Sequence, residues 1–520
     1  MPGYTLRETL VKNHVSAAWD ASATALVFED RDLTYGELSR EVDNIAQGLL
    51  EEGFRHGDRV LALLPNGVEY VELFFAVASV GGVLVPANYL LSPPEIEHVW
   101  SDSESTWLVV HEKYLAKAQG ILDDLGDTHR VFLVGGSGGV RDYEELRRDG
   151  TGLRAPAVDV GDLVLLQYTS GTSGLPKAAM HTHSTLMWNM MQQVVDFGLT
   201  RDDIYVCVPA LCWAAGFHDF FLPLLWVGGK VVLLPSQNFD PEQLAALTAA
   251  HDGTIVLLVP SVLRKVVGDG ILTRYELKSL RLLLSGGEPL PIELIEQVQS
   301  QLPHVWLAQV YGMTEGPMIM TFLSETDAHS RRGSAGKALV ATQVRVVDDQ
   351  DQPVEPRVVG EIVVRSPGTM TGYLNAPEKN REVFRTGWFH TGDGGYLDED
   401  GYLYIAGRVK DMFITGGLNV YPAEIERVLL SHEGVAEAAV VGVDDERLGE
   451  VGQAHVVLRD GATVTMDSLR AFAAEQLATY KVPRHWQPRT DSLPRTASGK
   501  IKKSALRSTP PTAMDQRDEG

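Results

Sequence analysis

The residues with the clearest chemical meaning lie in one run, residues 168–177, which reads YTSGTSGLPK. The apolar residues 163–167 before it predict a buried strand that feeds a loop rich in Gly, Ser and Thr. Such a loop offers unhindered backbone N–H groups, several hydroxyl donors and one cation, which together can hold phosphate. The candidate phosphate ligands are Thr169, Ser170, Gly171, Thr172, Ser173, Gly174 and Lys177.

Two other interpretations of this loop stay open. A Walker A loop needs glycine directly before its lysine and Ser or Thr directly after it. Here Pro176 precedes Lys177 and Ala178 follows, so the hydroxyl that binds a metal in a P-loop is missing. A P-loop NTPase is therefore disfavoured, and a plain Gly/Ser surface loop remains the second alternative.

Composition narrows the classes of protein. A chain of 520 residues allows two to four domains or subdomains. Its net charge of −24 disfavours nucleic acid as a partner, because phosphate backbones require clustered Lys and Arg. Two cysteines cannot build a disulfide framework, so we expect a cytoplasmic protein. No secretory signal is recognisable, and the longest apolar run, residues 217–227, is too short and too interrupted for a membrane span.

The elements that position the loop alternate between helix-like and strand-like patterns. Residues 33–52 have helical spacing and open with a capping-box pattern at Thr34 and Glu37. Strand patterns recur at residues 59–64, 83–87, 107–110, 131–134, 204–208, 231–234, 254–259 and 282–284. This alternation predicts an α/β fold with layered subdomains and mostly parallel sheets. After Gly333 short strands predict a small β-rich subdomain, and a compact α+β unit follows a charged, hinge-like segment at residues 407–411.

Four further motifs follow the loop along the chain: YGMTE (311–315), HTGD (390–393), GRVKDMFITGGLNVYPAEIE (407–426) and PRTASGK (494–500). Together with the loop they resemble the core motifs of the adenylate-forming superfamily, which includes acyl-CoA synthetases, amino-acid adenylation domains and luciferases. The resemblance covers nearly the whole chain. It implies an N-terminal adenylate-forming domain at residues 1–407 and a mobile C-terminal domain at residues 408–507. Residues 508–520, rich in Pro, Thr and charge, are expected to be a disordered tail.

The resemblance implies two half-reactions with ATP and Mg²⁺. A carboxylate attacks the α-phosphorus of ATP to give acyl-AMP and pyrophosphate, and a thiol then displaces AMP. Because negative charge gathers at the α-phosphate, fixed positive groups and a metal should dominate the first step. Lys500 is expected to be the catalytic cation, bridging the carboxylate and α-phosphate oxygens. Its alternative is a solvated lysine in a basic tail.

The same resemblance assigns the nucleotide contacts. Glu315 would hold Mg²⁺, a hard cation that prefers oxygen ligands. Thr314 would donate to the α-phosphate and Tyr311 would stack on adenine, while Asp393 would accept from both ribose hydroxyls. The adenine wall and further nucleotide contacts would come from Gly286, Gly287, Glu288, Gly312 and Arg408. Outside the family context, each of these motifs also fits an ordinary turn.

The second half-reaction needs water excluded and a thiol admitted. The family achieves this by rotating the C-terminal domain, and its pivot corresponds to Lys410. Gly416 and Gly417 match the glycines beside the pantetheine tunnel, although a strand-end turn would also explain them. The acceptor is expected to be CoA or a carrier-protein phosphopantetheine acting in trans.

The acid is expected to bind at residues 208–229, and the candidate pocket residues are Trp213, Phe217, His218, Asp219 and Phe220. This segment departs from the fatty-acyl pattern, which disfavours a long-chain fatty acid. A carboxylate at Asp219 would repel the substrate's own carboxylate unless it met an ammonium group. The segment thus resembles that of stand-alone β-amino-acid-activating enzymes, so we expect a carboxylic acid substrate, with a β-amino acid as one candidate. In one alternative Asp219 pairs structurally with His218 or a neighbouring Arg. In the other the protein is a fatty- or aryl-acyl-CoA synthetase without amino-group recognition.

Two readings from other classes are disfavoured. A luciferase-like oxygenase would need an unusual substrate, of which the sequence carries no sign. A nucleotide-binding homologue without catalysis is opposed by the joint presence of Lys177, Glu315, Asp393, Arg408 and Lys500.

Overall fold

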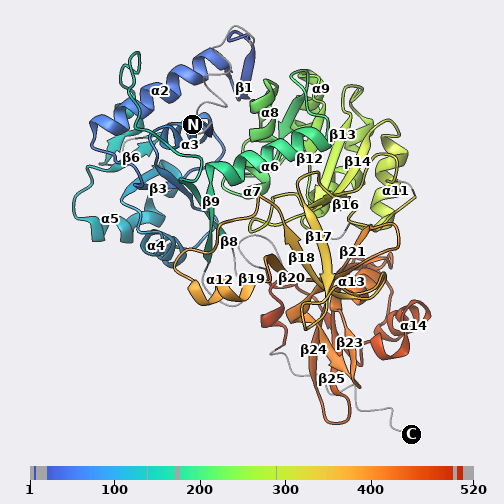
Figure 1. Cartoon of the computed structure of the whole chain (residues 1–520). Helices are drawn as coiled ribbons and strands as arrows, with labels where there is room; N and C mark the ends of the chain where they lie inside the picture. Colours follow the sequence, from blue (N-terminus) through green and yellow to red (C-terminus); the bar gives the residue numbers. More distant parts are fainter. Residues whose placement is uncertain are drawn as a thin grey trace.

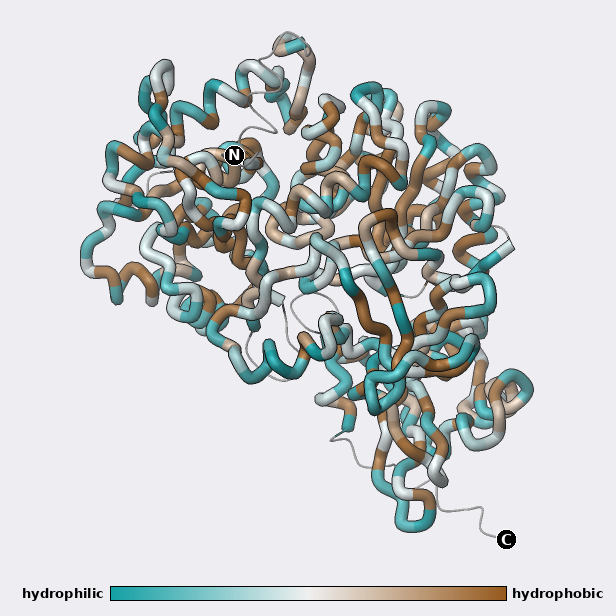
Figure 2. The backbone as a smooth tube through the Cα atoms, viewed as in Figure 1, coloured by the Kyte–Doolittle hydropathy of each residue, from teal (hydrophilic) through white to brown (hydrophobic). Residues whose placement is uncertain are grey.

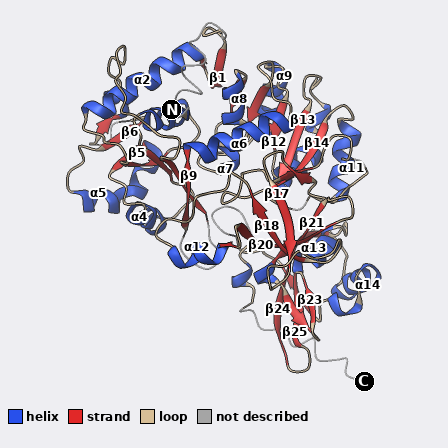
Figure 3. Cartoon of the chain, in the orientation of Figure 1, coloured by secondary structure: helices blue, strands red, loops and turns tan. Residues whose placement is uncertain are grey.

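A computed structural model gives the fold, and it describes residues 5–6, 20–136, 139–169, 176–288, 290–328, 330–495 and 501–507. Figure 1 shows two large lobes side by side and a smaller body, formed by the last part of the chain, below them. In Figure 3 helices cover the sheets of both lobes, whereas strands dominate the lower part. The α/β class with a large N-terminal and a small C-terminal domain is therefore confirmed.

The first lobe is built on a seven-stranded sheet in the order β7-β6-β5-β3-β4-β8-β9, parallel except for the β8–β9 pair. Helix α2 begins with the predicted capping box, in which Thr34 and Glu37 bond each other's backbone. The strands are β3 (Arg59–Leu63), β4 (Val83–Pro86), β5 (Trp107–His111), β6 (Val131–Val134), β7 (Arg141–Asp142), β8 (Leu163–Thr169) and β9 (Lys177–Thr182); the helices are α2 (Tyr35–Glu51), α3 (Val68–Ser79), α4 (Pro93–Asp102) and α5 (Gln119–Leu125).

The second lobe is built on a nine-stranded sheet in the order β16-β15-β14-β13-β12-β10-β11-β1-β2. Its six central strands run parallel, so the carboxyl ends of β13 and β14 meet at one edge. The strands are β1 (Thr24–Phe28), β2 (Arg31–Thr34), β10 (Ile204–Cys207), β11 (Lys230–Leu233), β12 (Ile255–Leu257), β13 (Leu282–Gly286), β14 (Trp306–Tyr311), β15 (Thr321–Phe322) and β16 (Lys337–Ala338). The helices are α6 (His183–Asp196), α7 (Ala214–Phe217), α8 (Phe221–Val227), α9 (Pro241–Ala250), α10 (Pro260–Gly268) and α11 (Ile292–Gln301).

A five-stranded sheet follows where the sequence predicts a β-rich subdomain. Its order is β17-β18-β20-β19, and β21 pairs with the other end of β20. The elements are β17 (Gln343–Val347), β18 (Gly360–Arg365), α12 (Pro377–Val383), β19 (Phe384–Arg385), β20 (Trp388–Leu397) and β21 (Leu403–Arg408). This sheet carries the HTGD motif on β20, and its strand β21 leads into the C-terminal unit.

The C-terminal unit has its own five-stranded sheet, in the order β23-β22-β25-β24 with β26 beside β25. The 3-10 segment η5 (Val409–Asp411) precedes it. The elements are β22 (Phe413–Thr415), β23 (Leu418–Val420), α13 (Pro422–Leu430), β24 (Val435–Asp445), β25 (Gly449–Leu458), α14 (Met466–Gln476) and β26 (His485–Arg489). A separate core of side chains such as Phe413, Ile425 and Trp486 lies within this unit.

The main core lies in the two large lobes. One continuous apolar cluster includes side chains from β3, α3, α8 and β10, which joins the two lobes. Figure 2 shows the strands of both lobes as mostly brown, apolar tubes with teal segments at the loops. Within the described ranges, no helix combines the length and the apolarity needed to cross a membrane.

Candidate active site

The carboxylate of Asp393, the last residue of the HTGD motif, lies at the centre of one hydrogen-bonded cluster. Asp393 on β20 is opposite Arg408 of β21 in the strand register. The Tyr311 hydroxyl, at the end of β14, donates to Asp393 Oδ2 at 2.7 Å, and Arg408 Nε pairs with Oδ1 at 2.8 Å. Burial and the neighbouring Asp393 charge raise the pKa of Tyr311 far above its usual value, so the phenol stays a donor. Three sequence-predicted nucleotide residues are thus brought together.

The YGMTE carboxylate lies in a second cluster. The Thr169 hydroxyl, at the end of β8, donates to Glu315 Oε1 at 2.9 Å. The Tyr373 hydroxyl donates to the same oxygen at 3.1 Å. The backbone beside Glu315 is also fixed, because His181 Nε2 donates to the carbonyl of Thr314 at 2.9 Å. Burial lowers the pKa of His181 to about 4, so this imidazole is neutral.

Only the two ends of the predicted phosphate loop lie within the described residues. Thr169 and Lys177 are partners in the antiparallel register of β8 and β9, so the base of the loop is closed. The His98 imidazole bonds the carbonyl of Pro176 at 3.0 Å, close to the same base. The remaining predicted ligands, Ser170, Gly171, Thr172, Ser173 and Gly174, and the predicted catalytic Lys500 lie outside the described residues.

The glycines of the nucleotide motifs stand where the backbone approaches closely. Gly286 ends β13, and a Cβ there would lie 2.6 Å from both the side chain and the carbonyl of Val310. At Gly312 a Cβ would lie 1.8 Å from the Met318 carbonyl oxygen. Gly287 has φ +84°, in the left-handed region that favours glycine. Glu288 follows as an exposed residue. Packing thus gives these glycines a structural reason, beside their predicted nucleotide contacts.

Two of the predicted acid-pocket residues lie fully in the core. The ring of Phe217 stacks edge-on against Phe74 at 4.7 Å, and Phe220 stacks against Phe197 at 5.0 Å. Trp213 is partly exposed, yet its indole N–H is buried without a hydrogen-bond partner among the described residues. The segment therefore combines core side chains with one aromatic residue whose polar atom no described residue pairs with.

His218 and Asp219 are both buried next to Gln193 of α6. Neither imidazole nitrogen of His218 has a partner in the part of the chain that the structure describes, and burial lowers its pKa to about 3. Burial raises the pKa of Asp219 to about 7, and its partner is the Gln193 amide at 3.5 Å. The same amide donates to the His218 carbonyl at 3.2 Å. The structural partner of Asp219 is thus a neutral amide rather than the His218 or Arg expected in the structural alternative.

The hinge and tunnel candidates lie where the chain enters the C-terminal unit. Lys410 is in η5, two residues after Arg408, and burial lowers its pKa. Gly416 and Gly417 form the two-residue turn between β22 and β23, with φ +57° and +82°. Two consecutive positive φ angles are typical of a type I′ hairpin turn. The turn alone therefore explains both glycines, and their role beside pantetheine stays a prediction.

Sequence reasoning missed two residues that hold this site. Tyr373 reaches Glu315 from a segment without a recognised motif. Glu361 on β18 accepts from the Gly392 N–H at 3.1 Å through Oε1, and its Oε2 lies 2.9 Å from His390 Nδ1. Glu361 thereby fixes the HTGD turn by hydrogen bonds from the neighbouring strand. The one available signal was the glycine directly before each residue, Gly360 and Gly372.

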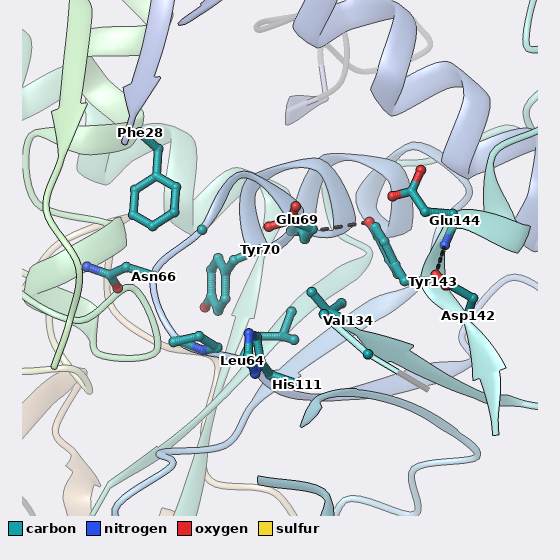
Figure 4. Close-up of a pocket in the computed structure, with 14 residues that line it drawn as sticks. Phe28, Leu64, Asn66, Glu69, Tyr70, His111, Val134, Asp142, Tyr143 and Glu144 are labelled. Atoms are coloured by element: carbon teal, nitrogen blue, oxygen red, sulfur yellow. Dashed lines mark hydrogen bonds between the residues drawn. The ribbon is translucent and has the colours of Figure 1, made fainter. Parts of the chain in front are cut away.

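A cavity of about 380 Å³ lies elsewhere, at the carboxyl ends of β3, β5 and β6 (Figure 4). None of the predicted site residues lines it. Among its polar side chains, Glu69 pairs with Arg31 at 3.0 Å and Asp142 accepts from the N–H of Glu144 at 2.9 Å, whereas the buried Tyr70 hydroxyl has no partner among the described residues. This cavity therefore takes no part in the candidate site.

Comparison with known proteins identifies the family. Residues 14–374 match the family model described as AMP-binding enzyme, and residues 424–500 match the AMP-binding enzyme C-terminal domain. A feruloyl-CoA synthase of an Amycolatopsis species is 39% identical over 487 residues, covering 93% of this chain and 95% of that protein.

Two solved structures agree over nearly the whole chain. An anthranilate CoA ligase in complex with anthranoyl-AMP gives a TM-score of 0.88 at 29% identity, with 97% of both chains covered. The o-succinylbenzoate CoA synthetase of Bacillus subtilis, in complex with its acyl-adenylate intermediate, gives 0.86 at 30% identity over 97% of this chain and 98% of that one. The latter enzyme is also known in complex with ATP and a magnesium ion. This chain therefore belongs to the AMP-binding enzyme family and is an ATP-dependent, AMP-forming ligase.

Proposed function

We propose that this protein converts an aromatic carboxylic acid to its CoA thioester through an aryl-AMP intermediate. The observation that supports the proposal is the pair of clusters around Asp393 and Glu315, both of which interact electrostatically with Arg408. The choice of acid is supported by the similar proteins, whose names specify feruloyl, anthranoyl and succinylbenzoyl groups. These relatives favour the aryl- or acyl-CoA alternative over a β-amino acid and a carrier protein.

In the first step the acid's carboxylate oxygen attacks the α-phosphorus, and pyrophosphate leaves with the electrons of the broken P–O bond. The proposal gives Lys500 the charge between the two reacting groups and Thr314 a hydrogen bond to the α-phosphate. Asp393 would bind the ribose diol, with Arg408 beside it, and Tyr311 would stack on adenine. In the second step the thiolate of CoA attacks the acyl carbon and AMP leaves.

The donor set at Glu315 fits Mg²⁺. The ion is usually held by one or two carboxylates together with substrate phosphates. The described residues hold no group of three or more His, Cys, Asp or Glu that could bind a metal by themselves. Glu315 would therefore share the ion with ATP, where the ion would neutralise phosphate charge. What this chain supplies is an oriented carboxylate.

The proposed domain arrangement follows from the second step. Residues 408–507 would turn about Lys410 after adenylation, so that Gly416 and Gly417 come beside the incoming thiol. The segment around Lys410 suits such a pivot, since it links two separate sheets through the short η5.

Pyrophosphate exchange into ATP, measured across a panel of acids, tests the function. We expect exchange with cinnamate- or benzoate-type acids, and little with β-amino acids or long-chain fatty acids. With the best acid, CoA should yield a thioester, whereas a phosphopantetheinylated carrier protein should not. Exchange that requires an amino group, or acyl transfer only to the carrier protein, would contradict the proposal.

A further inference from the structure

The carboxylate of Glu315 is held unevenly by its surroundings. Thr169 and Tyr373 both donate to Oε1, at 2.9 and 3.1 Å. Oε2 accepts no hydrogen bond from any residue in the described ranges. Two donors on Oε1 fix the rotation of the carboxylate and leave Oε2 available to bind a ligand. This asymmetry is what a site needs if one oxygen must be ready for a ligand.

Tyr373 is itself firmly placed. Its N–H donates to Asn380 Oδ1 at 2.7 Å, and its carbonyl accepts from Asn380 Nδ2 at 2.9 Å. The backbone forms a bridge with Ala179 of β9, so Tyr373 is attached to the strand that follows the phosphate loop. Gly372 before it has φ +145°, a conformation that L side chains rarely adopt. The phenol therefore reaches Glu315 from a rigid support.

The same segment also holds the main chain of the YGMTE motif. The N–H of Met370 donates to the carbonyl of Glu315 at 3.0 Å. Both the backbone and the side chain of Glu315 are thus tied to the segment of residues 370–373. Groups behind a metal ligand that fix its orientation commonly change metal affinity or activity 10- to 100-fold when removed.

We propose that Tyr373, together with Thr169, is a positioning residue that turns Oε2 of Glu315 toward Mg²⁺ bound with ATP. The inference rests on the proposed function, in which Glu315 shares the ion with the nucleotide. It gives Thr169 a different task from the phosphate contact expected from the sequence. Tyr373 acts only through Glu315 and touches no reacting atom.

The test compares Tyr373→Phe with Tyr275→Phe. Tyr275 is a matched control, because its hydroxyl also donates to a glutamate, Glu242, at 2.8 Å, and it belongs to none of the site clusters. The probe is a non-hydrolysable ATP analogue, whose dissociation constant is measured in EDTA and in saturating Mg²⁺. The ratio of the two constants reports how strongly metal and nucleotide binding are coupled.

We expect Tyr373→Phe to reduce this ratio about tenfold while leaving affinity in EDTA within about twofold. The Mg²⁺ concentration for half-maximal pyrophosphate exchange should rise by a similar factor, and the KM for the acid should stay unchanged. Tyr275→Phe should change none of these values. Thr169→Val provides a second variant, expected to act in the same direction.

An unchanged ratio in both Tyr373→Phe and Thr169→Val would overturn the inference. So would an equal loss of affinity in EDTA and in Mg²⁺, because that pattern indicates a purely structural role, such as packing against Met370 and Phe389. A failure of the proposed function looks different. In that case no aromatic acid supports exchange, although the coupling between Mg²⁺ and the analogue in the wild type remains.

Discussion

Asp393 and Asp219 are equally buried, each with 7% of its surface exposed, yet their surroundings differ. Asp393 pairs with the Arg408 guanidinium and accepts from the Tyr311 phenol. Asp219 has the neutral Gln193 amide as its partner, and burial raises its pKa to about 7. A buried carboxylate keeps its charge only where a cation or several donors support it. The proposed nucleotide side, around Asp393, therefore supports a permanent charge, whereas the proposed acid side, around Asp219, favours a neutral carboxyl.

The difference suits the two ligands. Every reaction of this kind uses the same nucleotide, so fixed charges and paired donors can be placed for it in advance. The acid varies between relatives, from feruloyl to anthranoyl and succinylbenzoyl groups. A segment of buried rings whose polar atoms have no partner among the described residues, such as the Trp213 indole, can be altered without disturbing the charged cluster.

The strongest test of the comparison removes the permanent charge. Asp393→Ala should lower kcat/KM for ATP by about 100- to 1000-fold, since the variant loses the proposed ribose contact and leaves Arg408 without its partner. Pyrophosphate exchange at varied ATP measures the effect. Asp149→Ala, at an exposed turn, is the control and should change nothing. If acid affinity fell as much as ATP affinity, the division into two sides would be wrong.

A weaker effect is expected one step away from that charge. Glu361→Gln keeps an oxygen for one contact but loses the carboxylate that holds both His390 and the Gly392 N–H. We expect kcat/KM for ATP to fall about tenfold, because the turn that carries Asp393 becomes less fixed. The KM for the acid should stay the same. Steady-state kinetics with each substrate varied in turn separates these values, and an effect on the acid alone would refute the assignment.

The sequence predicts the grouping of residues around Asp393 well and the surroundings of Asp219 poorly, for a physical reason. Tyr311, Asp393 and Arg408 belong to ordered motifs, and the structure joins them. The sequence does not indicate Tyr373, because it lies 58 residues from its partner Glu315, in a segment without a recognised motif. The fold class followed from alternating strand and helix patterns, since parallel strands need crossover helices.

On the acid side, composition cannot separate a pocket wall from a core. Phe217 and Phe220 have the same apolar character in either place, and only packing against Phe74 and Phe197 assigns them to the core. The sequence also does not indicate the neutral partner of Asp219, because Gln193 comes from a helix 26 residues earlier. Long-range contacts of this kind decide whether a carboxyl stays charged.

The near-neutral state of Asp219 predicts a dependence of stability on pH. The unfolded chain loses this proton near pH 3.8, whereas the folded chain keeps it until about pH 7. The native state thus binds more protons between these values, and the contribution of Asp219 to stability falls as pH rises through this window. Asp219→Asn should therefore gain in melting temperature relative to the wild type, by a few degrees, between pH 5 and pH 8.

Asp203 supplies the opposite control for that measurement. Although burial opposes its ionisation, the Arg281 guanidinium and neighbouring donors hold the pKa of Asp203 below its ordinary value. Asp203→Asn should destabilise the protein at neutral pH, and the loss should shrink as the pH falls below 4. Parallel pH trends for the two variants would contradict the contrast between a supported and an unsupported carboxylate.

The smallest effect is expected from Asp219→Ala on the reaction itself. If Asp219 is a nearly neutral structural group, kcat/KM for an aromatic acid should change by less than about threefold, because the substrate carries no ammonium for it to bind. If Asp219 instead recognises an amino group, removal of the carboxylate should cost an amino acid substrate about 100-fold or more, since a buried charge would lose its partner. Pyrophosphate exchange with paired substrates that differ only in the amino group distinguishes the two outcomes. A loss confined to the amino-bearing substrate would mean that Asp219 is charged when that substrate is bound. The contrast with Asp393 would then lie only in the source of the cation, which the substrate supplies at Asp219 and Arg408 supplies at Asp393.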